Sequence, residues 1–290
     1  MILNVEYSCP QNLKELLEQL AHAGETGKII AGGTDVIPAL RQRSPRFVRV
    51  KKLIDIRKID ELHRVEQTEK GLSIGSGVTF SEITRHPVIR EKFPLLAQAA
   101  SRVGSVQIRN RATIAGNIVN NAPCADSVPP LLVYNANLVV LSNNGERVIP
   151  VAEFLAAPYR TNLQTDEIVT RIELPNIAAG YRGEFYKLGR RRAVAISRIT
   201  LAVLAKVENN TIEDIRIASG AVTPVAKRFF DLEKNVIGKE FSKELCIHLS
   251  RELGKSVMEI TGLRYSSAYK LPVVQQMFYQ LLRRIETGNH

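Results

Sequence analysis

Apolar residues recur along the first part of the chain at the intervals of alternating strands and helices. Four leucines show the i, i+3, i+4, i+7 spacing of one helix face: Leu13, Leu16, Leu17 and Leu20. Short apolar runs at 3–7 and 28–31 predict a strand on either side of this helix. The second run leads into two glycines and then a short helix beginning near Asp35, with Thr34 or Asp35 as its cap. The pattern predicts a strand, turn and helix unit.

Further apolar runs predict a sheet with inserted helices as far as residue 177. Strands are expected at 53–56, 62–67, 72–75, 138–141, 147–149 and 168–174, and helices within 80–102 and at 128–134. Asn143-Asn144-Gly145 predicts a hairpin turn, because Asn-Gly readily adopts the positive φ angles of a tight turn. A glycine-containing turn followed by a polar loop is expected at 113–117.

The pattern changes after about residue 179. Strands are expected at 183–188, 200–207 and 212–219, followed by helices that include a long one at 273–285. Strands followed by helices are typical of a separate α+β unit. The sequence therefore predicts two domains, residues 1–177 and residues 178–290.

Composition excludes several classes of protein. The longest apolar stretch, 128–141, is interrupted by prolines and asparagines and falls short of the roughly 18 apolar residues of a membrane span. The N-terminus has no basic segment followed by an apolar one, so no secretory signal is predicted and a cytoplasmic protein is expected. Cys9, Cys124 and Cys246 lie far apart and the histidines lack metal-ligand spacing, which predicts no zinc, haem or iron–sulfur site in this chain.

The net charge of +11 comes from dispersed basic residues. Local basic runs at 41–46, 51–52 and 190–192 contain no interleaved aromatic residues, which disfavours nucleic-acid binding. A partner or substrate with an acidic surface is the better expectation.

Two turns carry candidate chemistry. In the segment from Ile29 to Val36, Gly32 and Gly33 would let backbone N–H groups approach a pyrophosphate at the start of a helix, although such a turn is more often only a turn. The segment 113–117 and Asp126 supply a hydroxyl, an amide and a carboxylate that suit ribityl and ribose hydroxyls. Each of these residues also has a structural interpretation as a helix or turn cap.

Six motifs in combination favour the functional interpretation. They are AGGTD at 31–35, IRNRATIAGN at 108–117, APCADSVPPLL at 122–132, DEIVTRIELP at 166–175, FYKLGRRRAVAISRI at 185–199 and VTPVAKR at 222–228. In order and spacing this set resembles the FAD-binding subunits of the molybdenum hydroxylases, such as those of xanthine, carbon monoxide and nicotinate dehydrogenases. Ala115 departs from the family, in which many members have glycine, and slightly less room beside the pyrophosphate is expected.

The resemblance implies a fold and a set of cofactor contacts. The fold would be a vanillyl-alcohol-oxidase-type (PCMH-like) FAD-binding domain followed by a small α+β C-terminal domain. Pyrophosphate loops are implied at Ile29, Ile30, Ala31, Gly32, Gly33, Thr34, Asp35 and Val36, and at Thr113, Ala115, Gly116 and Asn117. Val103 would line the flavin pocket, Asp126 would bind a cofactor hydroxyl, Val169 would pack against the adenine and Lys187 would approach the flavin. The run Arg190-Arg191-Arg192 would border the isoalloxazine ring or form a solvated surface.

The same resemblance implies an assembly. A large subunit would bind molybdopterin, a small subunit would carry two [2Fe–2S] clusters, and the FAD of this chain would pass electrons to NAD⁺ or another acceptor, in a dimer of heterotrimers. No catalytic residue is expected in the chain, since the cofactor carries the chemistry. The segment 116–127 favours the purine-oxidising members, and carbon monoxide, nicotinate or aldehyde dehydrogenases compete with them. A standalone flavoenzyme of the same fold and a basic binding module are two rival interpretations.

Overall fold

The N-terminal segment forms a small parallel sheet in a computed structural model of the protein, which describes residues 5–191 and 194–288. Its strand order is β1-β3-β2, with β1 (Glu6–Ser8), β2 (Gly27–Ile30) and β3 (Lys52–Asp55). The expected strand at 3–7 is therefore placed later, and its residues 3 and 4 lie outside the described residues. Short 3-10 turns connect these elements: η1 (Gly24–Thr26), η2 (Pro45–Phe47) and η3 (Asp60–His63).

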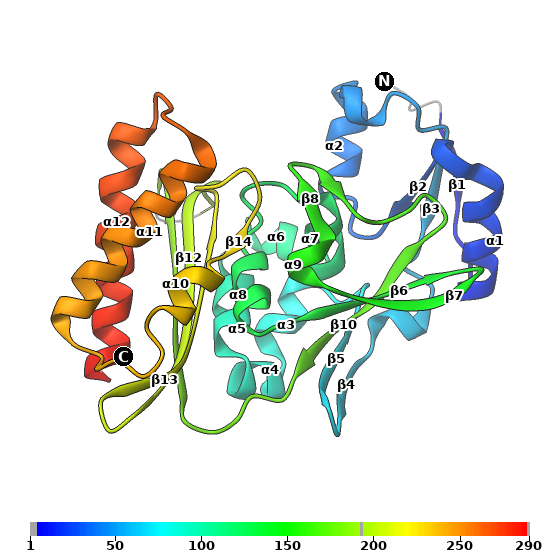
Figure 1. Ribbon diagram of the computed structural model, residues 1–290. Coiled ribbons are helices and arrows are strands. Elements are labelled where there is room, and N and C mark those ends of the chain that lie inside the picture. Colours follow the sequence, from blue (N-terminus) through cyan, green and yellow to red (C-terminus); the bar gives the residue numbers. More distant parts are fainter. Residues whose placement is uncertain (1–4, 192–193, 289–290) are drawn as a thin grey trace.

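Two helices cover the opposite faces of this sheet (Figure 1). The leucine face of α1 (Leu13–Ala23) packs with Ile54 of β3, which confirms the predicted amphipathic helix. The buried side of α2 (Val36–Arg41) packs with Leu53. Successive strand residues point to opposite faces, so neighbouring residues of β3 serve the two helices.

An antiparallel sheet of five strands follows, in the order β4-β5-β10-β6-β7. Its strands are β4 (Val65–Thr68), β5 (Gly71–Gly75), β6 (Asn137–Ser142), β7 (Gly145–Pro150) and β10 (Ile168–Pro175). The predicted hairpin is confirmed, but Asn143 and Asn144 alone form its turn, because Gly145 already pairs with Ser142 as the first residue of β7. The predicted strand 62–67 is wrong in its first residues, because Leu62 is buried in a 3-10 turn and the strand begins only at Val65.

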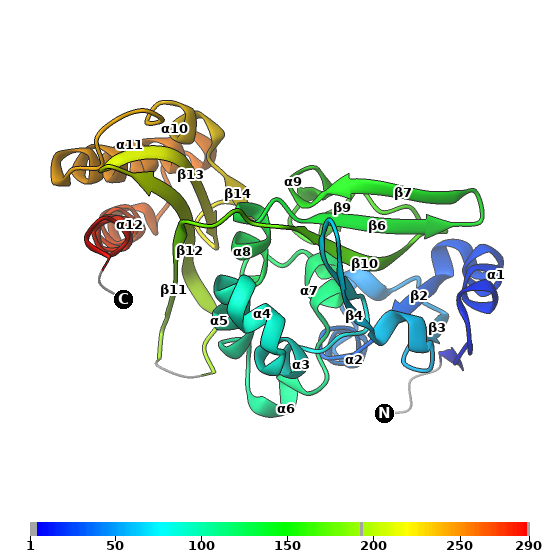
Figure 2. The same cartoon turned by 90° about the horizontal axis from the view of Figure 1, so that it is seen from below.

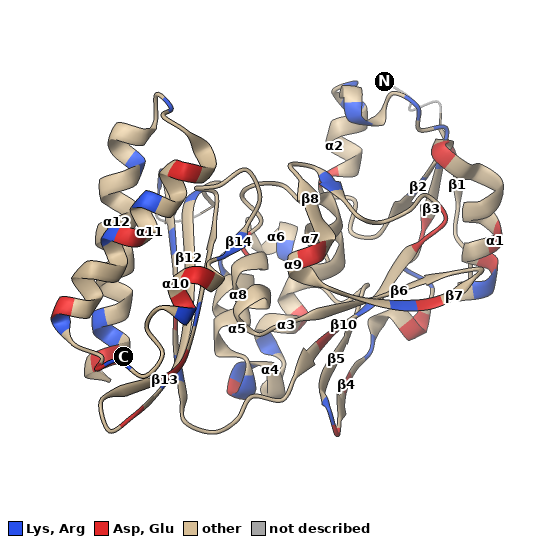
Figure 3. Cartoon of the chain, in the orientation of Figure 1, with Lys and Arg blue, Asp and Glu red and all other residues tan. Residues whose placement is uncertain are grey.

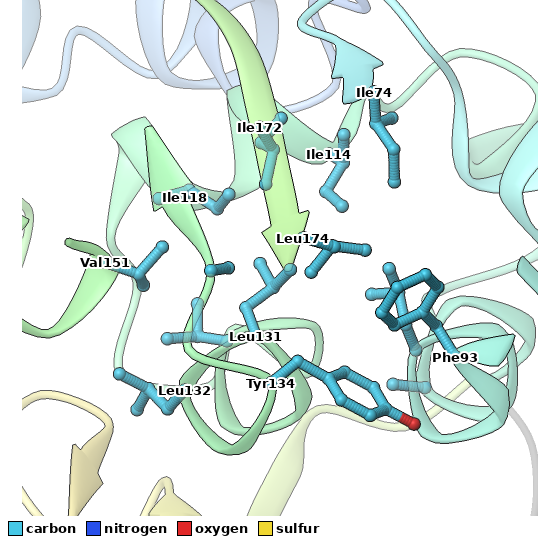
Figure 4. Packing of buried hydrophobic residues seen from close by; sticks show 14 of the residues in the cluster. Ile74, Phe93, Ile114, Ile118, Leu131, Leu132, Tyr134, Val151, Ile172 and Leu174 are labelled. Carbon is cyan, nitrogen blue, oxygen red and sulfur yellow. The ribbon is translucent and has the colours of Figure 1, made fainter. Parts of the chain in front are cut away.

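Short helices pack on this sheet and enclose a large core. They are α3 (Phe80–Arg85), α4 (Pro87–Lys92), α5 (Pro94–Ser101), α6 (Val106–Arg109), α7 (Ile114–Asn120), α8 (Val128–Val133) and α9 (Val151–Phe154). A two-stranded ribbon, β8 (Leu155–Ala157) and β9 (Arg160–Thr161), follows α9. Figure 4 shows Ile172 and Leu174 of the sheet facing Ile114, Leu131 and Tyr134 from the helices. The Phe93 and Tyr134 rings pack edge to face, with their centroids 5.2 Å apart.

The C-terminal part is a separate sheet of four strands with helices on its outer face. The antiparallel order is β11 (Tyr181–Gly189), β12 (Ser197–Glu208), β13 (Thr211–Gly220) and β14 (Lys227–Arg228). Helices α10 (Phe230–Lys234), α11 (Lys243–Thr261) and α12 (Ser267–Thr287) follow. The long helix begins at Ser267, earlier than predicted, because Pro272 removes one backbone donor without ending the helix.

The C-terminal sheet lies between its own helices and those of the first part (Figure 2). Residues such as Leu201 and Val203 pack against α11 and α12, while Ala202 and Leu204 belong to the core of the first part. The predicted division after residue 177 falls in the connection between β10 and β11. One face of β12 thus packs against the first part and holds the two parts together. The neighbouring strand β11 lies against α5.

Candidate cofactor-binding cleft

The second glycine of the turn after β2 adopts a backbone conformation that favours glycine. Gly33 has φ +73°, a left-handed conformation that β-branched residues avoid. A Cβ atom at this position would lie 3.1 Å from Cδ1 of Ile30 and 3.3 Å from Cγ1 of Ile37. The crowding would therefore come from the protein itself, in addition to any effect on a ligand.

Gly32 allows two loops to touch through their backbones. A Cβ atom at Gly32 would lie 1.9 Å from the carbonyl oxygen of Arg111 and 2.9 Å from Cα of Ala112. A methyl group cannot occupy that space, so the two segments approach only because this residue has no side chain. The contact joins the first glycine turn to the residues just before Thr113, and this close approach cannot be inferred from the sequence motif.

The segment 113–117 was predicted to be a turn, and that prediction is wrong because it begins helix α7. Thr113 is the N-cap, and its hydroxyl accepts a hydrogen bond from the Gly116 amide at 3.1 Å. Asn117 accepts a hydrogen bond from the Ser127 hydroxyl at 2.8 Å through its side-chain oxygen. The Thr113 cap therefore begins a helix in which Ala115 and Gly116 line the cleft without bulky side chains.

A cleft of about 880 Å³ lies along both segments, a volume within the range of cofactor sites. Most of the residues implied by the family resemblance line it: Ile29, Ala31, Gly32, Gly33, Thr34, Asp35, Val36, Val103, Thr113, Ala115, Gly116, Asn117 and Val169. Ile30 is instead a buried core residue of β2. The fold thus gathers three segments that are distant in sequence around one elongated cavity.

The cleft also has lining residues that sequence reasoning missed: Lys28, Arg46, Arg49, Asn120, Tyr159 and Arg160. Burial, together with the positive charge of Arg46, lowers the pKa of Lys28. Burial raises the pKa of Asp35, with Arg46 opposing that shift. Basic residues are dispersed over both parts of the chain in Figure 3, so only the fold reveals which of them meet at the cleft. Glu25, which pairs with Arg49, and Glu167 line the cleft as well, and the remaining basic residues can attract an anionic ligand such as a dinucleotide.

Asp126 and Lys187 lie beside the cleft and bind each other. The Lys187 ammonium is 2.5 Å from Oδ2 of Asp126, and the Ser197 hydroxyl donates to Oδ1 of the same carboxylate. Lys187 also donates to the carbonyl oxygen of Arg102 at 2.8 Å, directly before the cleft-lining residue Val103. Burial raises the pKa of Asp126, and the charge of Lys187 opposes that shift. A buried ion pair therefore connects β11 to the first part of the chain, while cofactor contacts of these two residues stay predictions.

The arginine run lies at the end of β11. Arg190 and Arg191 are exposed, and the Arg191 guanidinium donates to the carbonyl oxygen of Val194 at 2.6 Å. Arg192 lies outside the described residues. In the part of the chain that the structure describes, no cluster of three metal-ligating side chains occurs and no helix has the length and hydrophobicity to cross a membrane.

Comparison with known proteins agrees with this architecture. A family model described as the FAD binding domain in molybdopterin dehydrogenase matches residues 3–177, and one described as the CO dehydrogenase flavoprotein C-terminal domain matches residues 184–285. The glyceraldehyde dehydrogenase medium chain of Sulfolobus acidocaldarius is 30% identical over 282 residues, covering 96% of this chain and 97% of that one.

Two further relatives agree with these matches. The putative xanthine dehydrogenase FAD-binding subunit of Escherichia coli is 31% identical over 252 residues, covering 86% of this chain and 85% of that one. A solved chain of the carbon monoxide dehydrogenase from Hydrogenophaga pseudoflava matches with a TM-score of 0.91 and 28% identity, covering 99% of both chains. The fold class implied by the sequence motifs is confirmed, and the chain belongs to the family of FAD-binding medium subunits of the molybdenum hydroxylases.

Proposed function

We propose that the chain transfers electrons through FAD, from [2Fe–2S] clusters on a small partner subunit to NAD⁺ or another acceptor. A large partner subunit would oxidise the organic substrate at molybdopterin, in a cytoplasmic dimer of heterotrimers. The observation that carries the proposal is the cleft between the glycine turn and the start of α7, in a chain of this family. The two structural parts would serve as domains 1–177 and 178–290.

The residues that line the cleft fit the cofactor. The turn at 31–35 and the first residues of α7 present backbone and small side chains, which leave space for a pyrophosphate. Val103 would border the flavin and Val169 the adenine, because these apolar side chains lie on the cleft wall. Bound FAD would supply one- and two-electron transfer, whereas the chain's own residues bind it, orient it and shield it from water.

Cofactor binding is tested directly on the purified chain. The protein is expected to bind FAD noncovalently, with flavin absorbance that passes to the supernatant after acid precipitation. A colourless protein that gives no response in a flavin titration would favour a basic binding module instead. A yellow precipitate with a colourless supernatant would contradict noncovalent binding.

The arginine run tests the route to the acceptor. Positive charge at Arg190 and Arg191 should favour reduced flavin and the docking of an anionic dinucleotide. In the assembled enzyme, Arg190→Ala or Arg191→Ala should slow NAD⁺ reduction while substrate reduces the molybdenum centre at the normal rate in stopped flow. Slower reduction of molybdenum with normal acceptor turnover would contradict this role.

We propose that the assembled enzyme oxidises a purine, as the purine-oxidising members of the family do. This proposal rests on the resemblance of the segment 116–127 and on the relative named as a xanthine dehydrogenase subunit. The alternative substrates are glyceraldehyde, carbon monoxide and nicotinate, after which other relatives are named. Steady-state turnover of the assembled complex on each substrate distinguishes them, and preference for an aldehyde or nicotinate over xanthine would refute the purine proposal.

A further inference from the structure

Two segments that are far apart in the sequence meet at the cleft. The guanidinium carbon of Arg46, in η2, lies 4.0 Å from the ring centroid of Tyr159, in the turn between β8 and β9. Arg46 also donates a hydrogen bond to the side-chain oxygen of Asn120 at 3.1 Å. All three residues line the cleft, so their contacts join its walls.

Hydrogen bonds with Asn121 fix the backbone around Tyr159. The Tyr159 amide donates to the Asn121 carbonyl oxygen at 2.9 Å. The Asn121 side chain, only 2% exposed, donates to the carbonyl oxygens of Ala157 and Arg160 at 2.8 and 2.9 Å. Tyr159 has φ +60°, an unfavourable conformation for tyrosine that these contacts hold in place. The backbone of this turn is therefore attached to the end of α7 while the Tyr159 ring stays 46% exposed.

Arg46 is exposed, but it lies next to a buried residue. Its neighbour Phe47 is 7% exposed, and the Phe47 ring lies 5.2 Å from the Arg46 guanidinium carbon and 5.9 Å from Nζ of Lys28. Arg46 also acts electrostatically on Lys28 and Asp35, which both line the cleft. The segment is thus anchored in the core, whereas the guanidinium group can leave Tyr159 without disturbing buried contacts.

We propose that Arg46 and Tyr159 form a latch across the cleft that slows the release of FAD. The proposal rests on the proposed function, because it takes FAD as the occupant. The stacked pair joins two walls of the cleft, so an occupant that leaves between these walls must separate the pair. Both side chains are substantially exposed, and a cation–π contact in such a place adds little to the stability of the fold.

The rate of FAD dissociation from the loaded full chain measures the latch. Release is followed by the fluorescence of free FAD after the loaded chain is diluted far below its dissociation constant, so that released FAD does not rebind. Arg46→Ala and Tyr159→Ala should each raise the dissociation rate about two- to fivefold, the factor that corresponds to loss of one exposed cation–π contact. Tyr159→Phe keeps the ring and should release FAD at the wild-type rate.

Coupling and charge controls complete the test. The double variant Arg46→Ala/Tyr159→Ala should release FAD no faster than the faster single variant, because both changes remove one contact. Arg41→Ala removes a charge from the neighbouring helix α2, where Arg41 is exposed and does not line the cleft, so the rate should stay at the wild-type value.

Three results would overturn the latch. The first is a faster release for Arg46→Ala but not for Tyr159→Ala, which would make Arg46 a direct ligand. The second is an equally faster release for Arg41→Ala, which would indicate an effect of bulk charge. The third is independent and additive effects in the double variant. A wild-type chain that binds no FAD would instead refute the proposed function.

Discussion

Replacing Lys187 by methionine is expected to destabilise the FAD-free protein by about 3–5 kcal/mol. The side chains of Lys187 and Asp126 are only 9% and 6% exposed, so the substitution leaves a carboxylate buried without its cation. The Ser197 hydroxyl still donates to that carboxylate, but a neutral donor does not balance a buried charge. The carbonyl oxygen of Arg102 loses its donor as well.

Removing both charges separates the cost of the unpaired carboxylate from the value of the pair. Lys187→Met combined with Asp126→Leu should be more stable than Lys187→Met alone, since apolar residues often replace a buried pair at little cost. Lys206→Met is the matched control on the neighbouring strand β12, where Lys206 pairs with Glu208 at 2.6 Å on the surface. This control should lose less than about 1 kcal/mol.

Guanidinium chloride unfolding, followed by circular dichroism, gives the free energy of unfolding for all four proteins. The reasoning is refuted if Lys187→Met behaves like Lys206→Met, or if the double variant is no more stable than Lys187→Met. A flavin titration adds an independent comparison. Weaker FAD binding by Lys187→Met with an unchanged unfolding free energy would identify Lys187 as a flavin contact rather than a tie between the two parts.

Three further substitutions test other features. Gly33→Val should abolish FAD binding, because φ +73° and two neighbouring isoleucines leave no room for a β-branched residue; wild-type affinity in a flavin titration would remove this turn from the site. Tyr134→Phe should cost about 1–3 kcal/mol in thermal unfolding, since the buried Leu95 amide loses its acceptor, and an unchanged midpoint would contradict that bond. Hydrogen bonds from Arg147 lower the pKa of Glu167, so their stabilisation is present at neutral pH and lost as pH falls through the depressed pKa. Glu167→Gln should therefore weaken the loss of stability that sets in below about pH 4.3, the ordinary glutamate pKa, and an unaltered pH profile would show that this pair contributes nothing.

Local patterns in the sequence determined much of the secondary structure and the family. The leucine spacing of α1 and the hairpin between β6 and β7 are short-range features, so they could be interpreted without the fold, although the turn itself is formed by Asn143 and Asn144. Gly33 was identified in the same way, because positive φ is a property of one residue and its neighbours. The motifs then placed the two pyrophosphate loops implied by the family on segments that do line one cleft.

Local patterns failed where neighbours in space outweigh neighbours in sequence. Residues 113–117 looked like a turn, but the Thr113 cap and the burial of Ile114 and Ile118 in the core stabilise a helix there. The long C-terminal helix was predicted only from residue 273, yet packing against the C-terminal sheet carries α12 through Pro272. Tertiary burial decided both cases, since it contributes more free energy than local propensity.

Only the tertiary structure decided the walls of the cleft and the partners of its charged groups. Nothing in the sequence relates Arg46 to Tyr159, or Lys187 to Asp126, 61 residues away. The backbone contact of Gly32 with Arg111 likewise exists only after the sheets and helices have packed. Hydrophobic periodicity and turn preference depend on a few neighbouring residues, so the sequence shows them directly. Contacts between distant residues depend on how buried surfaces pack together, and that packing is a property of the whole chain.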